Sequence, residues 1–257
     1  MEIFGYPLWS VLLVCGGVFL ASFVDAIGGG GGIISVPVYL LAGLPPHLAL
    51  GTNKLSSCIG TGASTFRYIK NGCVDWFLGI PSIGLALVGA HLGTRLQLLV
   101  EERYLEYVLL AVLPVVAVFL LRKNSLPEEA GKISRRLQCL IVWSAALVIG
   151  AYDGFYGPGT GTFLLLIFCH FGKMGLRTAS GNVKLVNLSS NIGALVTSAI
   201  HGKVLFPLGL VAAVFSVAGH YIGAGVTIRN GSKIVRPVIL TVLLLLAVKV
   251  LFELFAG

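Results

Sequence analysis

The feature that most constrains this chain is a series of long apolar segments with almost no charged residues inside them. We delimit these segments at 8–27, 33–43, 47–69, 74–99, 103–121, 137–151, 160–171, 177–200, 204–228 and 234–256. A membrane-spanning helix needs about 20 predominantly apolar residues, and most of the segments approach or exceed that length. The apolar runs are continuous and do not alternate with period two, which disfavours a transmembrane β-barrel. We therefore predict an all-α polytopic membrane protein.

Composition excludes the other broad classes. Hydrophobic residues make up 56% of the 257 residues and charged residues 11%, whereas a soluble domain carries about 25% charged residues. This excludes an ordinary soluble protein, a disordered chain and a nucleic-acid-binding domain, so the expected surroundings are a lipid bilayer. The sequence contains no cluster with metal-ligand spacing, and we expect neither a metal nor another cofactor.

Two of the apolar segments, 33–43 and 160–171, are too short to cross a bilayer comfortably. Each follows a glycine-rich interruption, GGGGG at 28–32 and GFYGPGTG at 154–161. This pattern predicts that a helix is broken, or that the chain forms a re-entrant hairpin, at two places. The sequence leaves both alternatives open.

The two halves of the chain resemble each other. Asp25 precedes the first glycine run as Asp153 precedes the second, and the polar segment around Lys54 recurs around Lys184. Unrelated apolar segments share leucine and alanine by chance, but seldom an intramembrane lysine in one register. We predict two transmembrane repeats, 1–121 and 137–257, joined by a polar connecting loop at 122–136.

The orientation of the repeats follows from the basic residues. If each half crosses an odd number of times, or combines a re-entrant hairpin with three spans, the halves are inverted. One side then holds twelve basic residues: Arg67, Lys70, Arg122, Lys123, Lys132, Arg135, Arg136, Lys173, Arg177, Arg229, Lys233 and Arg236. Four fall near the other side: Arg95, Arg103, Lys203 and Lys249. Because basic loops stay in the cytoplasm, we predict inverted repeats with a cytoplasmic connecting loop. If each broken segment is instead one full span, each half has four spans, the halves are parallel, and most of the difference in basic residues between the two sides disappears.

Inverted repeats with paired broken helices are typical of secondary transporters. Backbone that leaves helical geometry at membrane depth must be buried in protein or line a water-filled cavity, because lipid cannot bond its amides. The half-helices that begin near Ile33 and Thr160 are expected to direct their N-terminal amides at that cavity, which favours an anion.

Lys54 and Lys184 each lie seven residues into a segment, about 10 Å deep at the rise of a helix. An ammonium group is costly there, so we predict that both lysines bind an anion, with snorkelling towards the interface as the alternative. On this view Lys→Met should leave the fold intact or more stable. Polar residues at helical spacing accompany the lysines: Asn53, Ser57 and Thr61 in the first half, Asn187 and Asn191 in the second. Interhelical hydrogen bonding is their alternative role.

Asp25 and Asp153 have three candidate roles. Each could cap freed amides, pair with a lysine, or take up a proton that drives transport. His91 and His220 lie near corresponding positions, but nothing else in the sequence supports them as ligands. An intramembrane hydrolase with an aspartate dyad is disfavoured, because nearby lysines would hold both carboxylates ionised. We expect no catalytic residues and no enzyme.

Four stretches resemble the sulfite exporter TauE/SafE family of membrane permeases: DAIGGGGGIISVP, GLPPHLALGTNKL, YDGFYGPGTGTF and ASGNVKLVNLSSN. The resemblance covers nearly the whole chain and implies transport of small sulfur-containing anions such as sulfite, thiosulfate or sulfoacetate. The family motif carries over onto these positions: Gly29, Gly31, Asn53, Lys54, Asp153, Gly157, Gly159, Lys184, Asn187 and Asn191. One departure is Val183, which stands where the first half has Asn53, so the two half-sites are not chemically equal.

The sequence therefore predicts a multi-pass transporter of small anions in the cytoplasmic (inner) membrane of a prokaryote. Alternating access is the expected mechanism, with proton coupling through Asp25 or Asp153 as one option. A passive anion channel is the alternative. The expected partners are the anionic substrate and the bilayer, and the chain is expected to act as a monomer or a homodimer.

Overall fold

The computed structural model describes residues 2, 3, 5–101 and 127–241. The segment predicted at 103–121 and most of the segment at 234–256 lie outside these residues. The helices, in chain order, are α1 (Leu8–Gly28), α2 (Gly32–Leu41), α3 (Pro46–Lys70), α4 (Trp76–Leu99), α6 (Arg135–Phe155), α7 (Thr160–His170), α8 (Leu176–Ile200) and α9 (Phe206–Asn230). The chain is helical again over 232–241.

The prediction of an all-α polytopic membrane protein is confirmed. Five of these helices, α1, α4, α6, α8 and α9, are long and apolar enough to cross a membrane. Large apolar side chains such as Leu12 and Phe66 are more than 60% exposed on the outer surface, where they would contact the hydrocarbon core of a bilayer. Ahead of α1, β1 (Glu2–Ile3) and β2 (Tyr6–Pro7) form a small antiparallel pair that the apolar pattern did not predict.

Both predicted interruptions are present, and each is shorter than the glycine-rich stretch that signals it. Helix α1 ends at Gly28 and α2 begins at Gly32, while α6 ends at Phe155 and α7 begins at Thr160. Gly29 has φ 78° and ψ −177°, a conformation open almost only to glycine. The break therefore forms where the backbone has no side chain to exclude that geometry.

After each break the half-helix turns back beside the helix that precedes it. A methyl group added to Gly17 of α1 would lie 2.6 Å from Val38 near the end of α2. In the second half, the ring centroids of Tyr152 and Phe163 lie 5.6 Å apart. Gln138 at the start of α6 donates a 2.7 Å hydrogen bond to the carbonyl of Gly172 just beyond α7. Both short segments thus form re-entrant hairpins, the alternative that the sequence left open.

The helices of the two halves correspond in order and in length. Helices α1 and α6 each have 21 residues, and α3 and α8 each have 25 residues. The contacts repeat as well. A methyl group on Gly51 of α3 would overlap the carbonyl oxygen of Lys203, and one on Gly181 of α8 would overlap that of Cys73. The likeness between the two halves of the sequence is therefore also a likeness in structure.

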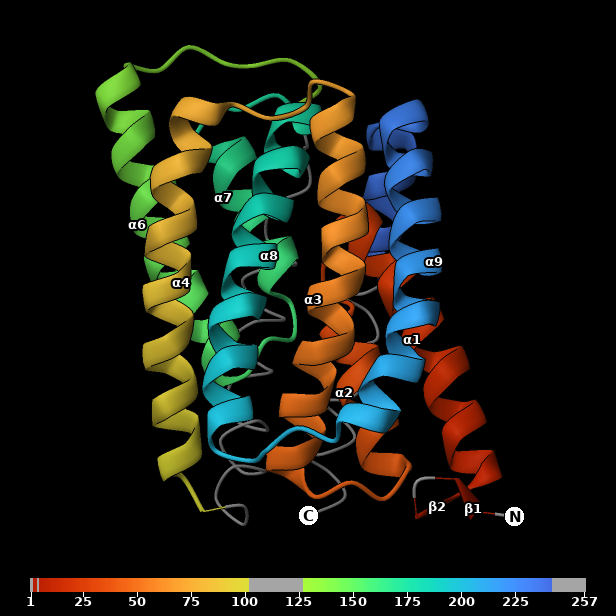
Figure 1. Cartoon of the computed structure of the whole chain (residues 1–257). Coiled ribbons are helices and arrows are strands. Elements are labelled where there is room, and N and C mark those ends of the chain that lie inside the picture. Colours follow the sequence, from red (N-terminus) through yellow and green to blue (C-terminus); the bar gives the residue numbers. More distant parts are fainter. Residues whose placement is uncertain (1, 4, 102–126, 242–257) are drawn as a thin grey trace, which may run out of the picture.

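Helices α3 and α8 are antiparallel and lie at the centre of the bundle (Figure 1). Thr65 near the end of α3 donates a 3.1 Å hydrogen bond to the carbonyl of Lys184 in the first half of α8. Gly51 near the start of α3 lies beside Ser198 near the end of α8. Helix α3 is too polar to count among the apolar spans, and its polar residues face other helices because neighbouring elements enclose it.

One end of the bundle gathers the turn after α3, the start of α6, the turn after α7 and the end of α9 (Figure 1). There, Arg135 pairs with Asp75 at 2.8 Å, and the carboxylate of Glu128 accepts a 2.8 Å hydrogen bond from the amide of Ser232. Hydrogen bonding to Ser232 is the main reason why the pKa of Glu128 is below its usual value. The grouping matches the side to which the sequence assigned most basic residues.

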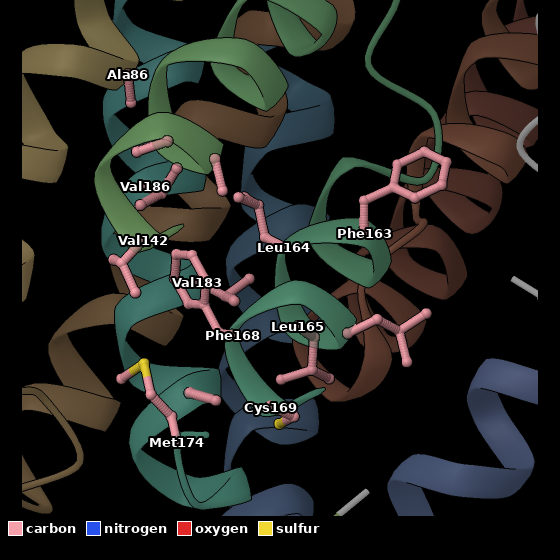
Figure 2. Packing of buried hydrophobic residues seen from close by; sticks show 14 of the residues in the cluster. Ala86, Val142, Phe163, Leu164, Leu165, Phe168, Cys169, Met174, Val183 and Val186 are labelled. Atoms are coloured by element: carbon pink, nitrogen blue, oxygen red, sulfur yellow. The ribbon is translucent and has the colours of Figure 1, made fainter. Parts of the chain in front are cut away.

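The largest apolar cluster surrounds α7. Figure 2 shows Leu164 and Phe168 of α7 among Val142 of α6 and Val183 and Val186 of α8. These five side chains are at most 2% exposed. The half-helix is therefore anchored by packing on one side, while its N-terminus remains next to the polar centre of the protein.

Candidate functional site

A polar cavity of about 40 Å³ lies between the two breaks. Its lining comes from both halves of the chain: Val18, Ala21, Ser22, Asp25, Gly31, Gly32, Ser35, Asn53, Lys54, Ser57, Thr61, Asp153, Gly157, Thr160, Gly161, Asn187, Asn191 and His220. Helices α1, α3, α6, α8 and α9 all contribute. Four of the polar residues that make α3 a poor span therefore form part of the cavity wall: Asn53, Lys54, Ser57 and Thr61.

The two breaks meet beside the cavity, and glycines allow the contact. A methyl group on Gly29 would overlap the backbone of Gly161 and Thr162, and one on Gly32 would lie 3.1 Å from Pro158. Thr162 also donates a 2.9 Å hydrogen bond to the carbonyl of Gly28. The close approach requires residues without side chains at the points of contact, which explains why glycine occurs in both breaks.

The first of two charged groups, which we call the Asp153 half-site, consists of Asp153 of α6 and its partners. Lys54 of α3 pairs with the Asp153 carboxylate at 2.9 Å, and both side chains are 7% exposed. Ser190 and Thr160 donate hydroxyl hydrogen bonds of 2.6 and 2.9 Å to the same carboxylate. Lys54 also donates to the Asn191 side-chain oxygen at 3.2 Å. The charges are thus paired and well supplied with hydrogen bonds.

The second group, the Asp25 half-site, consists of Asp25 of α1 and its partners. Lys184 of α8 pairs with the Asp25 carboxylate at 2.7 Å, with side-chain exposures of 3% and 18%. Lys184 also bonds the Asp25 carbonyl oxygen, and the amide of Gly31 donates to the carboxylate at 3.2 Å. The His220 Nε2 atom lies 3.9 Å from the same carboxylate.

Each ion pair joins the two halves of the chain. Lys54 of the first half pairs with Asp153 of the second, and Lys184 of the second half pairs with Asp25 of the first. The sequence offered capping, pairing and proton uptake as roles for the aspartates. The structure shows pairing at both and, at Asp25, capping of the Gly31 amide as well. Because each carboxylate has its own lysine, the arrangement does not form a dyad that shares one proton.

Most of the sequence-predicted ligands line the cavity: Asp25, Gly31, Asn53, Lys54, Ser57, Asp153, Gly157, Asn187 and Asn191. Lys184 and Gly29 instead line a separate, smaller pocket of about 10 Å³. Gly159 is the residue before α7, with φ 87°, and lies outside both linings. The expectation that both lysines face one cavity is thus met by Lys54 alone, because Lys184 lies behind Asp25.

The expected anion-binding amides are also partly occupied. The amide of Gly31 at the start of α2 already donates to Asp25. The Thr160 hydroxyl at the start of α7 donates to Asp153. A resident carboxylate therefore lies next to each half-helix N-terminus, as expected from the positive end of a helix dipole.

Five polar residues of the cavity or the half-sites were not predicted as ligands: Ser22, Ser35, Thr160, Ser190 and His220. Ser190 lies one helical turn beyond the predicted ligand Asn187, so helical spacing could have indicated it. His220 was noted but not supported as a ligand, although Ser216 lies one turn before it in α9 and bonds Ser22 of the cavity lining at 2.7 Å. It lies far from Asp25 in the sequence, and only the packing of α1 against α9 brings the two side chains together.

The fold and the site define a polytopic membrane protein with a polar, ion-paired centre formed between two halves. Residues 14–250 match the family described as "Sulfite exporter TauE/SafE". The chain belongs to this family, as the resemblance of its motifs indicated, and it is a membrane transporter.

Several relatives carry matching descriptions. "Probable membrane transporter protein ORF9" of Sinorhizobium sp is 33% identical over 98% of this chain and 96% of the relative. "Probable membrane transporter protein YfcA" of Escherichia coli K12 is 33% identical over 91% of this chain and 87% of the relative. A "Probable membrane transporter protein" of Haemophilus influenzae is 30% identical over 97% and 96%. No solved structure matches the chain.

Proposed function

We propose that this protein is a secondary transporter that binds a small sulfur oxyanion or organosulfonate at Lys54 and moves it across a prokaryotic inner membrane by alternating access. The observation that carries the proposal is the position of Lys54. Its ammonium is buried at the cavity, where a charge is retained only when it has a use. Asp153 and Asn191 take two of its hydrogen bonds, and an ammonium can donate three.

Neutral donors at the cavity complement the lysine. Ser57 and Thr61 of α3 and Asn187 of α8 line it together with Lys54. An oxyanion that leaves water needs several donors to replace its hydration. Hydroxyl and amide groups supply donors without adding charge, so they suit a ligand with several oxygen atoms around one centre.

The size of the cavity favours a compact ligand. One water molecule needs about 10–15 Å³ of cavity volume. The cavity of about 40 Å³ therefore holds a ligand with the volume of roughly three water molecules. A sulfite or thiosulfate is of this order, whereas the second acidic arm of sulfoacetate requires the cavity to widen. We therefore rank the compact oxyanions first among the ligands that the family resemblance suggests.

Alternating access is supported by the arrangement of the halves. Helices α3 and α8 hold corresponding lysines and run antiparallel, which supports inverted repeats. Both ion pairs cross between the halves, so a relative movement of the halves acts directly on the groups that hold the anion. A pore would not need such charged links between its two parts.

The proposal is tested by ligand-dependent stability of the purified protein. Sulfite, thiosulfate, sulfoacetate, sulfate and chloride are compared by their effect on thermal unfolding in detergent. A bound anion at 100 times its Kd should stabilise the protein by about 2.7 kcal/mol. Uptake into proteoliposomes should then saturate and show counterflow, which separates a carrier from a channel.

The double variant Lys54→Met, Asp153→Asn serves as the control, because it removes both charges and leaves no unpaired ion. It should keep the fold and lose the stabilisation by anions. Equal stabilisation of this variant and the wild type would place the anion elsewhere. A wild-type protein that responds to none of the five anions would contradict the proposed substrate class.

A further inference from the structure

The charges around the cavity cancel before any substrate enters. Lys54 and Lys184 are matched by Asp153 and Asp25, each in its own ion pair. An anion bound at Lys54 would therefore add a net negative charge to a buried site. An uncompensated charge in such surroundings is strongly unfavourable, so the site needs one more positive charge when the anion is present.

His220 is the titratable side chain of the cavity lining that has no strong partner. Its residue is 2% exposed, and its Nδ1 atom has no hydrogen-bond partner within the described part of the chain. Its Nε2 atom lies 3.9 Å from the Asp25 carboxylate, beyond hydrogen-bond distance. A buried nitrogen without a partner is unusual in a folded protein and indicates a missing proton or ligand.

At the position that corresponds to His220, the first half of the chain has no histidine, and the neighbouring His91 bonds Thr197 instead of lining the cavity. In the register that aligns Lys54 with Lys184, His220 of α9 corresponds to Ala90 of α4, which is fully buried. Gly60, which leaves room for the His220 ring, corresponds to Ser190, whose hydroxyl bonds Asp153. The duplicated fold therefore holds a titratable ring beside Asp25 and a fixed hydroxyl beside Asp153.

We propose that His220 binds the proton that accompanies the anion, so that one proton and one anion occupy the site together. The inference rests on the proposed anion site at Lys54. In the tautomer with hydrogen on Nε2, the lone pair of Nδ1 accepts the proton, and the ring gains one positive charge. No bond other than the new N–H forms or breaks. For a monoanion, the loaded cavity is electrically neutral. For a dianion such as thiosulfate, the same proton halves the net negative charge that the ligand brings to the site.

The neighbouring charges suit this role. From α1, Asp25 faces His220 and stabilises its protonated form. From α8, Lys184 opposes it but is held against Asp25. Helix α3 presents Gly60 at the ring and Lys54 across the cavity, and α6 presents Asp153 paired to Lys54. A bound anion would therefore be the group that tips the balance towards protonation.

The test is the pH dependence of binding to the purified full-length protein, with thiosulfate as the probe because it does not itself titrate near neutral pH. If one proton binds with the anion, the affinity of the wild type should fall by about tenfold per pH unit at the alkaline end of the range. His220→Gln should bind thiosulfate with an affinity that does not change between about pH 5.5 and 8. His91→Gln is the matched control, because His91 bonds Thr197 at 2.9 Å and does not line the cavity.

A second readout follows proton movement in proteoliposomes that contain a pH-sensitive dye. Thiosulfate entry should acidify the lumen with wild type and His91→Gln. With His220→Gln, the number of protons that enter per thiosulfate should fall. If His220→Gln does not fold, His220→Asn replaces it. Saturable thiosulfate binding without pH dependence in the wild type, or an unchanged slope in the variant, would overturn the role of His220 and leave the anion site standing. Absence of saturable binding of every anion would remove the proposed function itself.

Discussion

Each half-site contains its own lysine–aspartate ion pair, and the two half-sites differ in the groups that surround that pair. At the Asp153 half-site, two hydroxyls and Lys54 bond the carboxylate, and Asn191 holds the lysine. At the Asp25 half-site, Lys184 and a backbone amide bond the carboxylate, and His220 stands 3.9 Å away. One half-site is tightly bonded around a lysine that faces the cavity. The other is more exposed at its carboxylate and holds its lysine out of the cavity.

For the proposed transport function, this difference suggests different tasks for the two half-sites. Both half-sites contain the same pairing, in which a lysine of one half bonds an aspartate of the other half. Substitutions in register, such as Gly60 against Ser190 and Val183 against Asn53, then give the two pairs different surroundings. We infer that the Asp153 half-site serves the anion and the Asp25 half-site serves the charge balance, and the following predictions test this comparison.

The largest effect is expected from Gly29→Ala, compared with Gly157→Ala at the corresponding position of the other break. At Gly29 the new methyl group would overlap the backbone of Gly161 and Thr162, which cannot give way. At Gly157, where φ is 97° and alanine is strained as well, the methyl group would meet no backbone overlap and would approach the side chains of Lys54 and Asp153 at 3.2 and 3.3 Å, which can shift. Gly29→Ala should fail to yield a monodisperse protein on size-exclusion chromatography, whereas Gly157→Ala should assemble. Normal assembly of Gly29→Ala would mean that the breaks do not touch.

Next in size is the loss of stability when one lysine is removed. The sequence alone suggested that Lys→Met would be harmless, but the observed pairing changes that expectation, since each variant leaves a buried carboxylate unpaired. Breaking a buried pair costs about 3–5 kcal/mol. Lys54→Met should lie at the upper end and Lys184→Met lower, because the Asp25 side chain is 18% exposed and that of Asp153 only 7%. Unfolding by SDS in mixed micelles measures the difference.

The double variants separate the cost of an unpaired buried carboxylate from the cost of losing the packing of the lysine side chain. Adding Asp153→Asn to Lys54→Met, and Asp25→Asn to Lys184→Met, should restore most of the lost free energy of unfolding in each case. If the double variants are no more stable than the single ones, the lysines stabilise the fold by packing and not by their charge.

A third prediction compares anion affinity in the same double variants. Lys54 lines the cavity, so its loss removes a charge-assisted hydrogen bond worth about 1.5–3 kcal/mol, which is roughly a tenfold to hundredfold weaker Kd. Lys184 lies outside the lining, but Asp25 lines the cavity beside His220, so Lys184→Met with Asp25→Asn should weaken the Kd less than the loss of Lys54 does. Titration calorimetry with thiosulfate gives both values. Equal losses would show that the half-sites bind the anion jointly, contrary to the comparison.

Much of this site could be predicted from sequence because its signals are local. An intramembrane lysine, an aspartate before a glycine run and amides at helical spacing each stand out within a short segment. The recurrence of these signals in the second half then indicated the duplication, and the order and lengths of the helices agree with it. The glycine breaks were predicted for the same reason, since glycine alone tolerates the conformation found at Gly29.

The partners of these residues could not be predicted in the same way. Which lysine bonds which aspartate depends on the packing of α3 and α8 against the opposite hairpins, and the sequence contains no signal for it. The same holds for His220, which reaches Asp25 through the contact of α1 with α9. Lys184 shows the limit most clearly, because its position by symmetry suggested a ligand, whereas packing placed it behind a carboxylate.

The smallest effect is expected from Ser190→Ala, which makes the Asp153 half-site resemble the other at the position where Gly60 stands. The variant removes a hydroxyl donor at 2.6 Å from the carboxylate, while Lys54 and Thr160 still bond it. Loss of one such bond should cost about 1.5 kcal/mol of unfolding free energy. Ser189→Ala is the matched control, since Ser189 is also buried and its hydroxyl bonds the Leu185 carbonyl of its own helix. Such a bond to the preceding turn does not strengthen a helix, so its loss should cost about 0.5 kcal/mol, the low end for a neutral hydrogen bond. If the two alanine variants are equally stable, the hydroxyl does not hold Asp153, and the contrast between the half-sites reduces to His220 alone.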